Sequence, residues 1–334
     1  MALTLASSAL GQSTCNEFSP CYNQGYCDSD AMFCLWDQCN PAKSYNATSC
    51  WQPEGCTSRS VAFDSSSDVI GIRSYSGNPQ TNAFLSVFEP NNAKAANGNL
   101  ELDMTYDAPN NKGFGATVKS SGTIKYGKVT ARVKTASVAT GIVTSFIIMN
   151  EQTGDEIDFE WVGKNPAEVQ TNYYSNGELD YTKSTSFAMA DTSADFHEYT
   201  IDWAEDKTTW LVDNTVIRVL NRADTYDAKT GTYKYPTSEA RVSFGIWDGG
   251  NSGAQGTAEW SGYPTPWTAS TVYKAYVDSF TIECAGGSSE QPSVTDGGNE
   301  QSTDDNSGEQ STDDGNAQPT DGGNGEPIKC IPRY

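Results

Sequence analysis

The chain has 334 residues, of which 43 are Asp or Glu and 21 are Lys or Arg, so its formal net charge at pH 7 is −22. This charge argues against nucleic acid as a partner, because binding to phosphates requires Lys and Arg. It also argues against electrostatic adhesion to an anionic membrane. The eight Trp and seventeen Tyr are typical of a β protein with exposed stacking surfaces for carbohydrate, although we expect more than half of them in the core.

The first segment, MALTLASSALG, is short, apolar and rich in small residues. It is similar to a secretory signal with an A-x-A-like cleavage site at 9–11, although a basic n-region is missing. We predict a signal peptide over residues 1–11 and therefore a secreted protein. No stretch of the sequence is long enough to cross a bilayer as a helix, so we expect no membrane span.

A cysteine-rich module is predicted over residues 12–56, where seven of the nine cysteines lie. This density predicts a disulfide framework formed in an oxidising compartment. Zinc is the alternative, but the module has no Cys-x-x-Cys pair and the single histidine, His197, is far away, so we predict no metal site. Because nine is an odd number, at least one cysteine is free or pairs outside this chain. Asn46 begins an Asn-Ala-Thr sequon and is the predicted N-glycosylation site.

The spacing Cys21-x5-Cys27-x6-Cys34, with aromatic residues between the cysteines, resembles part of the hevein-like chitin-binding module. The adjacent Cys-Cys pair of that family is missing, so the resemblance is partial. Two interpretations stay open: the module is purely structural, or it binds chitin through aromatic side chains. The aromatic candidates are Tyr26, Phe33 and Trp36.

From residue 57 to residue 285 the sequence predicts many short strands that are broken by Gly, Asn and Asp turns. Alternating or continuous apolar segments recur at 128–134, 141–149, 199–203, 209–213, 216–220, 241–247 and 273–280. Regular short strands over such a length predict an all-β fold, a two-sheet sandwich or jelly roll. His197 stands at the start of one strand, and we interpret it as structural.

The most informative stretch is Gly154–Trp161, in which acidic and apolar residues alternate. With the period of a β-strand, its apolar face is directed to the core and its acidic face away from it. The acidic face consists of Glu156, Asp158 and Glu160. Like charges raise at least one pKa, and a protonated carboxylic acid beside an ionised carboxylate is what glycoside hydrolysis requires. The alternative is a merely solvated strand face.

Geometry adds a requirement to this hypothesis. Neighbouring residues on one face of a strand lie about 6.6–7 Å apart, so the backbones of Glu156 and Glu160 are about 13 Å apart. The two carboxyl groups of a retaining glycosidase are separated by only about 5–5.5 Å. The two Glu side chains must therefore lean toward each other over a concave sheet.

The composition changes after Cys284. The segment 299–307 is nearly repeated at 308–316, and both are dominated by small and polar residues. A segment with so few apolar residues cannot bury enough surface to fold. We predict a disordered, acidic tail rich in Ser, Thr and Gly over residues 286–334, which acts as a stalk or linker.

The motif Glu156-Ile-Asp-Phe-Glu160, preceded by 141–146, resembles the catalytic strand of glycoside hydrolase family 16. Its E-x-D-x-E form is that of licheninases, plant xyloglucan transglycosylases and fungal Crh cell-wall transglycosylases. The resemblance covers residues 60–284, with further matches at 169–174, 196–203 and 245–250. The cysteine-rich leader, the Ile-Trp-Asp-Gly-Gly signature and the acidic tail are most similar to the Crh group, which moves chitin chains onto glucan.

The resemblance implies a concanavalin-like β-jelly roll with a concave cleft and a retaining double displacement that needs no cofactor. Residue by residue, Glu156 matches the nucleophile and Asp158 the auxiliary carboxylate. Glu160 matches the general acid/base, which protonates the leaving sugar and later deprotonates the acceptor.

Substrate-binding residues are also implied by the resemblance. Gln170, Asn172 and Tyr174 share one face of the strand 169–174, and the last two match positions that contact the sugar near the cleavage point. Trp247 matches a cleft tryptophan that stacks on sugar rings, and polar turn residues follow it. The aromatic residues that we expect in the core instead are Trp161, Tyr173 and Trp203.

The sequence therefore predicts a secreted, cell-wall retaining glycosidase and transglycosylase that acts on polysaccharides as a monomer. The predicted reaction cleaves a β-linked polysaccharide, with chitin as the favoured donor, and transfers it to β-glucan. One alternative is a β-1,3-1,4- or β-1,3-glucan endohydrolase. An alternative of another class is a non-catalytic wall-binding lectin, against which the three intact carboxylates argue.

Overall fold

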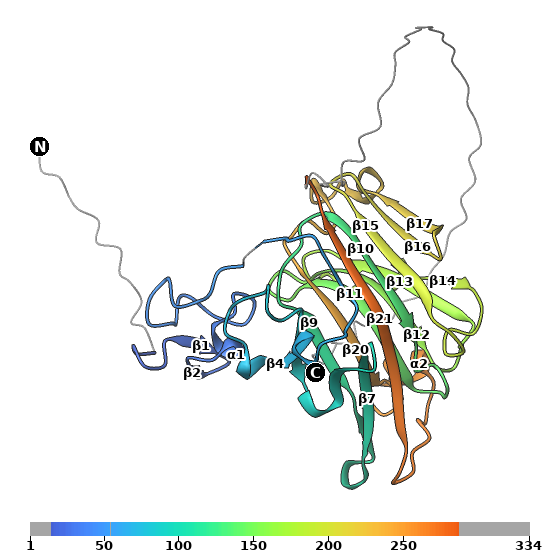
Figure 1. The fold of residues 1–334 in the computed structure, drawn as a ribbon. Coiled ribbons are helices and arrows are strands. Elements are labelled where there is room, and N and C mark those ends of the chain that lie inside the picture. Colours follow the sequence, from blue (N-terminus) through green and yellow to red (C-terminus); the bar gives the residue numbers. More distant parts are fainter. Residues whose placement is uncertain (1–14, 54, 287–334) are drawn as a thin grey trace, which may run out of the picture. The chain divides into compact units, whose positions relative to one another are not determined.

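The computed structural model describes residues 15–53 and 55–286, which belong to one compact unit (Figure 1). The predicted signal peptide over 1–11 lies outside the described residues, as does the predicted tail from residue 287 onward. Both therefore stay predictions, and so do the predicted boundaries between the cysteine-rich module and the jelly roll.

The first of two large sheets contains eight strands. They are β4 (Val69–Gly71), β5 (Phe84–Phe88), β9 (Ala116–Ser120), β11 (Ile142–Asn150), β12 (Asp155–Val162), β13 (Glu168–Tyr174), β14 (Thr185–Ala188) and β20 (Arg241–Asp248). Their order across the sheet is β14-β13-β12-β11-β20-β9-β5-β4. Neighbours in this sheet are antiparallel, except that β4 and β5 are parallel.

The second sheet contains nine strands. They are β3 (Arg59–Val61), β6 (Ala93–Ala96), β7 (Asn99–Asp107), β8 (Lys112–Phe114), β10 (Gly127–Lys134), β15 (His197–Trp203), β16 (Lys207–Val212), β17 (Thr215–Asn221) and β21 (Val272–Cys284). The order is β17-β16-β15-β10-β21-β7-β6, with β3 beside β21 and β8 beside β7. The two sheets confirm the predicted all-β sandwich.

Short elements complete the described chain. The short strands are β1 (Cys21–Asn23), β2 (Tyr26–Asp28), β18 (Tyr226–Asp227) and β19 (Thr232–Tyr233). The α-helices are α1 (Ala31–Cys34) and α2 (Gln255–Ser261). The 3-10 helices are η1 (Ser66–Asp68), η2 (Ile72–Ser74), η3 (Pro90–Asn92), η4 (Ala108–Asn110), η5 (Tyr181–Lys183) and η6 (Arg222–Thr225).

The hydrophobic core is shared by the two sheets, and the apolar face of β12 is part of it. Phe159 and Trp161 are fully buried and pack edge-on against Tyr199 of β15, with ring centroids 5.4 and 4.6 Å apart. Each such side chain contributes roughly 1.5–3 kcal/mol by leaving water. Trp203 and Tyr173 belong to the same cluster, so the predicted core positions are confirmed.

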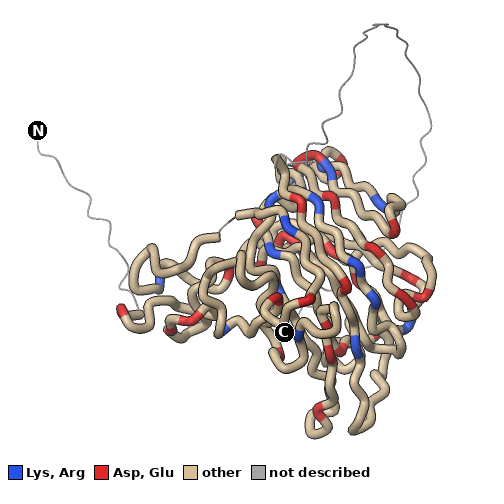
Figure 2. The backbone as a smooth tube through the Cα atoms, in the orientation of Figure 1, with Lys and Arg blue, Asp and Glu red and all other residues tan. Residues whose placement is uncertain are grey.

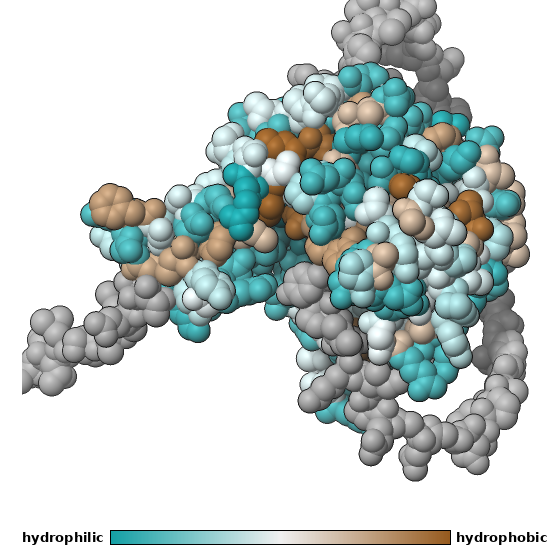
Figure 3. Space-filling view, turned by 90° about the horizontal axis from the view of Figure 1, so that it is seen from below, coloured by the Kyte–Doolittle hydropathy of each residue, from teal (hydrophilic) through white to brown (hydrophobic). Residues whose placement is uncertain are grey.

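Charged residues are distributed along the strands and loops of the described chain, with Lys and Arg interleaved among Asp and Glu (Figure 2). The face in Figure 3 is mostly hydrophilic, and its apolar residues gather in small groups. Within the ranges that the structure describes, none of the helices has the length and apolar composition needed to cross a bilayer.

The cysteine-rich module is held by disulfides within its own sequence. The three pairs are Cys15–Cys27, Cys21–Cys34 and Cys39–Cys50. They surround α1 and the β1–β2 hairpin, a segment too short to build a sufficient hydrophobic core alone. This confirms the predicted disulfide framework. Cys330 lies outside the described residues.

A fourth disulfide, Cys56–Cys284, joins the segment before β3 to the last residue of β21, across a sequence separation of 228. It closes the loop that contains almost the whole jelly roll. Asn46 is exposed on the module, and its side-chain oxygen accepts hydrogen bonds from the Thr48 backbone N–H and hydroxyl. Its glycosylation stays a prediction.

We expect replacement of both Cys56 and Cys284 by Ala to lower the free energy of unfolding by about 2–5 kcal/mol, because the cross-link restricts a very long loop in the unfolded chain. Urea unfolding beside the wild-type protein, both under oxidising conditions, measures the change. The matched control replaces Cys39 and Cys50, whose sequence separation is 11. A larger loss in the control would contradict the loop-length argument.

Candidate active site

Ile157, Phe159 and Trp161 of β12 belong to the core, so the acidic face of the strand points away from it, as the alternation predicts. β12 lies between β11 and β13 (Figure 1). Its carboxylate residues Glu156, Asp158 and Glu160 are only 5%, 1% and 7% exposed, so neighbouring groups enclose them. The residues directly opposite them on β13 are, in that order, Tyr174, Asn172 and Gln170. Trp247 of β20 is on the same side of the sheet, because Val143 of β11 pairs both with it and with Val162 of β12. The fold therefore brings all seven predicted catalytic and binding residues onto one face, which we call the acidic face of the sheet.

The backbone of this face is held from the core side. Trp210 of β16 donates its indole N–H to the backbone carbonyl of Asp158 at 3.0 Å, across the sandwich. Arg218 of β17 donates to the backbone carbonyl and the hydroxyl of Thr171, both at 2.8 Å, and to the carbonyl of Lys183. Burial lowers the pKa of Arg218, and the electrostatic interactions with Tyr173 and Asp158 oppose this shift. These contacts fix β12 and β13 relative to each other.

Asp155, the first residue of β12, is a fourth carboxylate with a different task. It is 3% exposed and accepts backbone N–H groups of Asn176, Thr237 and Ser238 at 2.8–2.9 Å. Gly154 before it has φ +73°, and a Cβ there would lie 2.4 Å from Gly177. The start of the strand is therefore fixed by a structural carboxylate and a glycine, a role that sequence analysis did not assign to Asp155.

Two tryptophans lie at the Glu160 end of the acidic face. Trp247 of β20 is half-buried and stacks on Trp260 of α2, with ring centroids 5.9 Å apart and planes 26° apart. Trp260 donates its indole N–H to the side-chain oxygen of Gln170 at 2.8 Å. The structure therefore joins the predicted residues Gln170 and Trp247 through Trp260, a residue that sequence analysis missed because α2 is separated from both strands in sequence.

The turn after Trp247 is organised by Asp248, which is 4% exposed. Its carboxylate accepts the backbone N–H of Gly113 at 2.8 Å, the hydroxyl of Thr265 at 2.5 Å and the indole N–H of Trp267 at 3.0 Å. A Cβ at Gly250 would lie 2.4 Å from the Thr265 hydroxyl, so the Gly residues of the Asp-Gly-Gly turn are needed for close packing. The turn thus supports Trp247 structurally.

An exposed aromatic lies at the Glu156 end. Tyr181 of η5 contacts Tyr174 edge-on, with ring centroids 6.4 Å apart, and is 54% exposed. Sequence analysis also missed Tyr181, because its segment carries no periodic pattern. Aromatic side chains therefore stand at both ends of the carboxylate row, where sugar rings could stack on them.

Asn172 stands opposite Asp158, near the middle of the row. Its side-chain oxygen is buried and has no hydrogen-bond partner among the described residues. Leaving a buried acceptor unsatisfied costs about 1–3 kcal/mol. A hydroxyl group of a bound ligand would remove this cost, so the arrangement suits a polyhydroxylated substrate.

Two pockets of the described residues lie away from the acidic face. One pocket is lined by 224–229 with Tyr173, Lys183 and Lys234. A second is lined by Asn111, Gly250, Asn251, Gly253, Ala254, Gln255 and Ala258, and neither pocket includes the carboxylates of β12. The described part of the chain contains no group of three or more His, Cys, Asp or Glu residues arranged to hold a metal ion.

Comparison with known families identifies the fold and the site together. Residues 80–262, more than half of the chain, match glycosyl hydrolases family 16. The chain belongs to glycosyl hydrolase family 16. The match contains β12, β13 and β20, as well as Tyr181 and Trp260, and it confirms the family that the Glu-x-Asp-x-Glu motif predicted.

Sequence relatives of this family 16 chain include Congo red hypersensitive protein 2 of Saccharomyces cerevisiae, which is 36% identical over 278 residues, 81% of this chain and 57% of that protein. Crh-like protein 3 of Botryotinia fuckeliana is 34% identical over 279 residues, 81% of this chain and 60% of that protein. The predicted resemblance to Crh proteins is confirmed. The chain spans somewhat more than half the length of these relatives.

Solved structures show the same fold. A Crh5 transglycosylase in complex with NAG has a TM-score of 0.56 and 27% identity, covering 69% of this chain and 85% of that chain. A Bacillus licheniformis beta-glucanase has a TM-score of 0.53 and 22% identity, covering 69% of this chain and 99% of that chain. The second likeness concerns the fold alone.

We expect Trp260→Ala to lower kcat/KM for a saccharide substrate by about tenfold, because it removes both the stacking contact to Trp247 and the hydrogen bond to Gln170. Trp260→Phe keeps the stacking and should lose only a few-fold. Steady-state kinetics of the two variants measures the difference. Trp267→Phe is the control, since it alters the Asp248 turn and should affect thermal stability more than kcat/KM.

Asp155→Asn should destabilise the fold by about 1–3 kcal/mol, because an amide cannot accept all three backbone N–H groups. Glu156→Gln, one position away, should leave the unfolding midpoint nearly unchanged while abolishing activity. Chemical unfolding of both variants separates the two roles. Equal losses of stability in the two variants would contradict the assignment of a structural role to Asp155 and a catalytic role to Glu156.

Proposed function

We propose that this chain is a secreted, cell-wall retaining glycosidase and transglycosylase, which cleaves a β-linked polysaccharide and transfers the released chain to a second polysaccharide. The observation that supports this most is the row Glu156, Asp158 and Glu160, faced by Asn172 and other polar or aromatic residues, in a chain of family 16. A row of carboxylates on one face of a strand supports a reaction that uses a pair of them.

In the first step, the carboxylate of Glu156 attacks the anomeric carbon of the donor. Glu160, as a carboxylic acid, gives its proton to the glycosidic oxygen, so the bond to the leaving chain breaks and that chain departs as an alcohol. The donor sugar is then bound to Glu156 as a glycosyl ester. Asp158, between the two, orients Glu156 and supports proton sharing in the row.

In the second step, Glu160 is a carboxylate and removes the proton of an acceptor hydroxyl. The acceptor oxygen attacks the anomeric carbon and releases Glu156, so two inversions retain the original configuration. If water is the acceptor, the result is hydrolysis; if a sugar is the acceptor, the result is transfer. Aromatic side chains at the ends of the row, Trp247, Trp260 and Tyr181, would hold a sugar acceptor and favour transfer over water.

Chitin as donor and β-glucan as acceptor follow from the resemblance to Crh proteins. The solved neighbour described as a Crh5 transglycosylase in complex with NAG, 27% identical, supports this choice. The disulfide framework of the module suits an extracellular, oxidising location. The proposal includes a monomer that acts on polysaccharides without a cofactor.

Mass spectrometry of products tests the proposal. The full chain is mixed with chitin oligosaccharides and a labelled β-1,3-glucan oligosaccharide, beside Glu156→Gln. We expect labelled hybrid chains from the wild-type protein and a loss of at least about 1,000-fold in the variant, which lacks the nucleophile. Glu205→Gln, a change at a side chain that is 76% exposed, is the matched control and should keep full activity.

Other outcomes would replace the proposal. Shortened glucan chains without hybrids would make the protein an endohydrolase of β-1,3- or β-1,3-1,4-glucan. Binding of saccharides without any product, unchanged in Glu156→Gln, would make it a lectin.

A further inference from the structure

The acidic face of the sheet continues beyond the carboxylates into an apolar region. Following cross-strand partners from Asp158 leads to Ile147, then Ser243, then Lys119 and finally Leu85 on β5. Paired residues point to the same side of a sheet, so Leu85 lies on the same face as Asp158. Leu85 is nevertheless 0% exposed, so another part of the chain covers it.

The cysteine-rich module provides this cover. Ala31 and Leu35 of the module pack with Ile72, Tyr75 and Leu85 in one buried apolar cluster. Because the module has little core of its own, it shares this cluster with the sheet. The module is therefore attached to the outward face of β4 and β5 and is a fixed part of that face.

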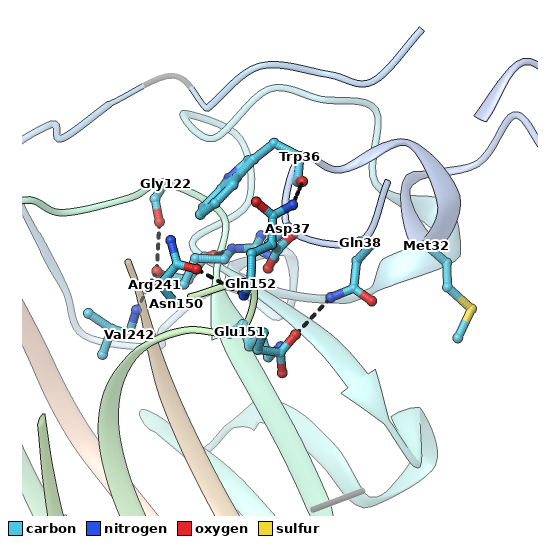
Figure 4. Close-up of polar contacts among 12 residues, drawn as sticks. Met32, Trp36, Asp37, Gln38, Gly122, Asn150, Glu151, Gln152, Arg241 and Val242 are labelled. Atoms are coloured by element: carbon cyan, nitrogen blue, oxygen red, sulfur yellow. Dashed lines mark hydrogen bonds and ion pairs between the residues drawn. The ribbon is translucent and has the colours of Figure 1, made fainter. Parts of the chain in front are cut away.

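Polar contacts extend the attachment to residues 36–38 of the module, which contact Arg241 and the segment after β11 (Figure 4). Asp37 forms an ion pair with Arg241 of β20 at 3.2 Å, with side chains only 4% and 2% exposed. Gln152, after β11, donates its side-chain N–H to the backbone carbonyl of Trp36 at 2.5 Å. The module residues 36–38 therefore lie beside the end of β11 and the start of β20.

A third polar contact joins the module to the same sheet. Gln38 donates to the carboxylate of Glu151 at 2.9 Å, and Glu151 forms an ion pair with Lys119 at 2.5 Å. Each residue of the short segment 36–38 therefore forms a hydrogen bond or an ion pair with the eight-stranded sheet or the segment after β11.

The register places this segment close to the proposed nucleophile. Arg241 is paired with Met149 of β11, and Met149 is paired with Glu156. Arg241 therefore lies two strands from Glu156, about 10 Å away, and on the same face. Asp37, in contact with Arg241, continues the row that begins with Tyr174 and Glu156.

Trp36 has the properties of a sugar-stacking residue at this position. It is half-buried, yet it belongs to none of the apolar clusters and stacks on no other aromatic ring among the described residues. The other two aromatic candidates of the module differ. Phe33 packs against the disulfide cluster and under Arg73, and Tyr26 is 72% exposed at the module surface.

We propose that residues 36–38 form a wall of the substrate cleft beyond Glu156, and that Trp36 stacks on a pyranose ring of a bound β-linked chain at an additional subsite. The module then lengthens the binding site of the catalytic sheet and is not a separately acting chitin-binding module. Because the disulfides and the Asp37–Arg241 pair already hold the segment, binding requires little further ordering. The inference rests on the proposed function for the nature of the ligand.

Calorimetric titration with the full chain carrying Glu156→Gln tests this without turnover. The ligands are chitin and β-1,3-glucan oligosaccharides, each in a short form that spans only the carboxylate row and a long form. In this background, Trp36→Ala should weaken binding of the long form of at least one class by about tenfold and leave the short forms unchanged. Trp36→Phe should retain most of the affinity, and Tyr26→Ala, the matched aromatic control, should bind like the parent.

In the otherwise wild-type protein, Trp36→Ala should raise KM for the long substrate and leave kcat/KM for the short substrate unchanged. Equal affinity of Trp36→Ala and its parent for the long forms would overturn the inference, and so would an equal loss in Tyr26→Ala. If Trp36→Ala loses affinity for short and long forms alike, and Trp36→Phe also has a lowered unfolding midpoint, then Trp36 has a structural role. This result would also overturn the inference. If long saccharides bind in a Trp36-dependent way but no hybrid products form, only the proposed transfer reaction is overturned.

Discussion

The two-faced strand β12 is the constraint on which the site depends. Its apolar residues enter the core between the sheets, where Trp161 and Phe159 meet Tyr199. A shift of one residue in its register would direct the carboxylates into the hydrophobic core and the aromatic residues to the outward face, at a cost of several kcal/mol. Packing of the apolar face of β12 in the core therefore sets the positions of Glu156 and Glu160 on its other face.

Indole N–H groups hold the eight-stranded sheet from both sides. On the core side, Trp210 binds the carbonyl of Asp158, and on the outward side Trp260 binds the side chain of Gln170. The buried carboxylates fall into two groups that differ in their hydrogen-bond partners. Asp155 and Asp248 accept several donors each and stabilise the strand start and a turn, whereas the carboxylates of the acidic face stand opposite β13. Carboxylates of the same type therefore have a structural role at Asp155 and Asp248 and the proposed chemical role on the acidic face, according to the groups that surround them.

The outward face of the sheet has two regions with different chemistry. The region over β12 and β13 is acidic and polar, whereas the region over β4 and β5 is apolar and is covered by the cysteine-rich module. A disulfide-rich segment of this size gains stability by sharing a core with a larger neighbour. The same packing carries Trp36 and Asp37 to the edge of the acidic region, so stability of the module and shape of the site follow from one interface.

Local patterns in the sequence determined the strand type, the family motif and the distribution of residues between the two faces of β12 and β13, because a period of two assigns each side chain to a face without knowledge of its partners. Cysteine density likewise indicated a disulfide framework. Only the tertiary structure decided that Trp260 and Tyr181 join the acidic face, that Asp155 is structural, and that Cys56 pairs with Cys284. It also decided where the module packs. These features rest on contacts between residues far apart in sequence, which leave no periodic signal in the chain.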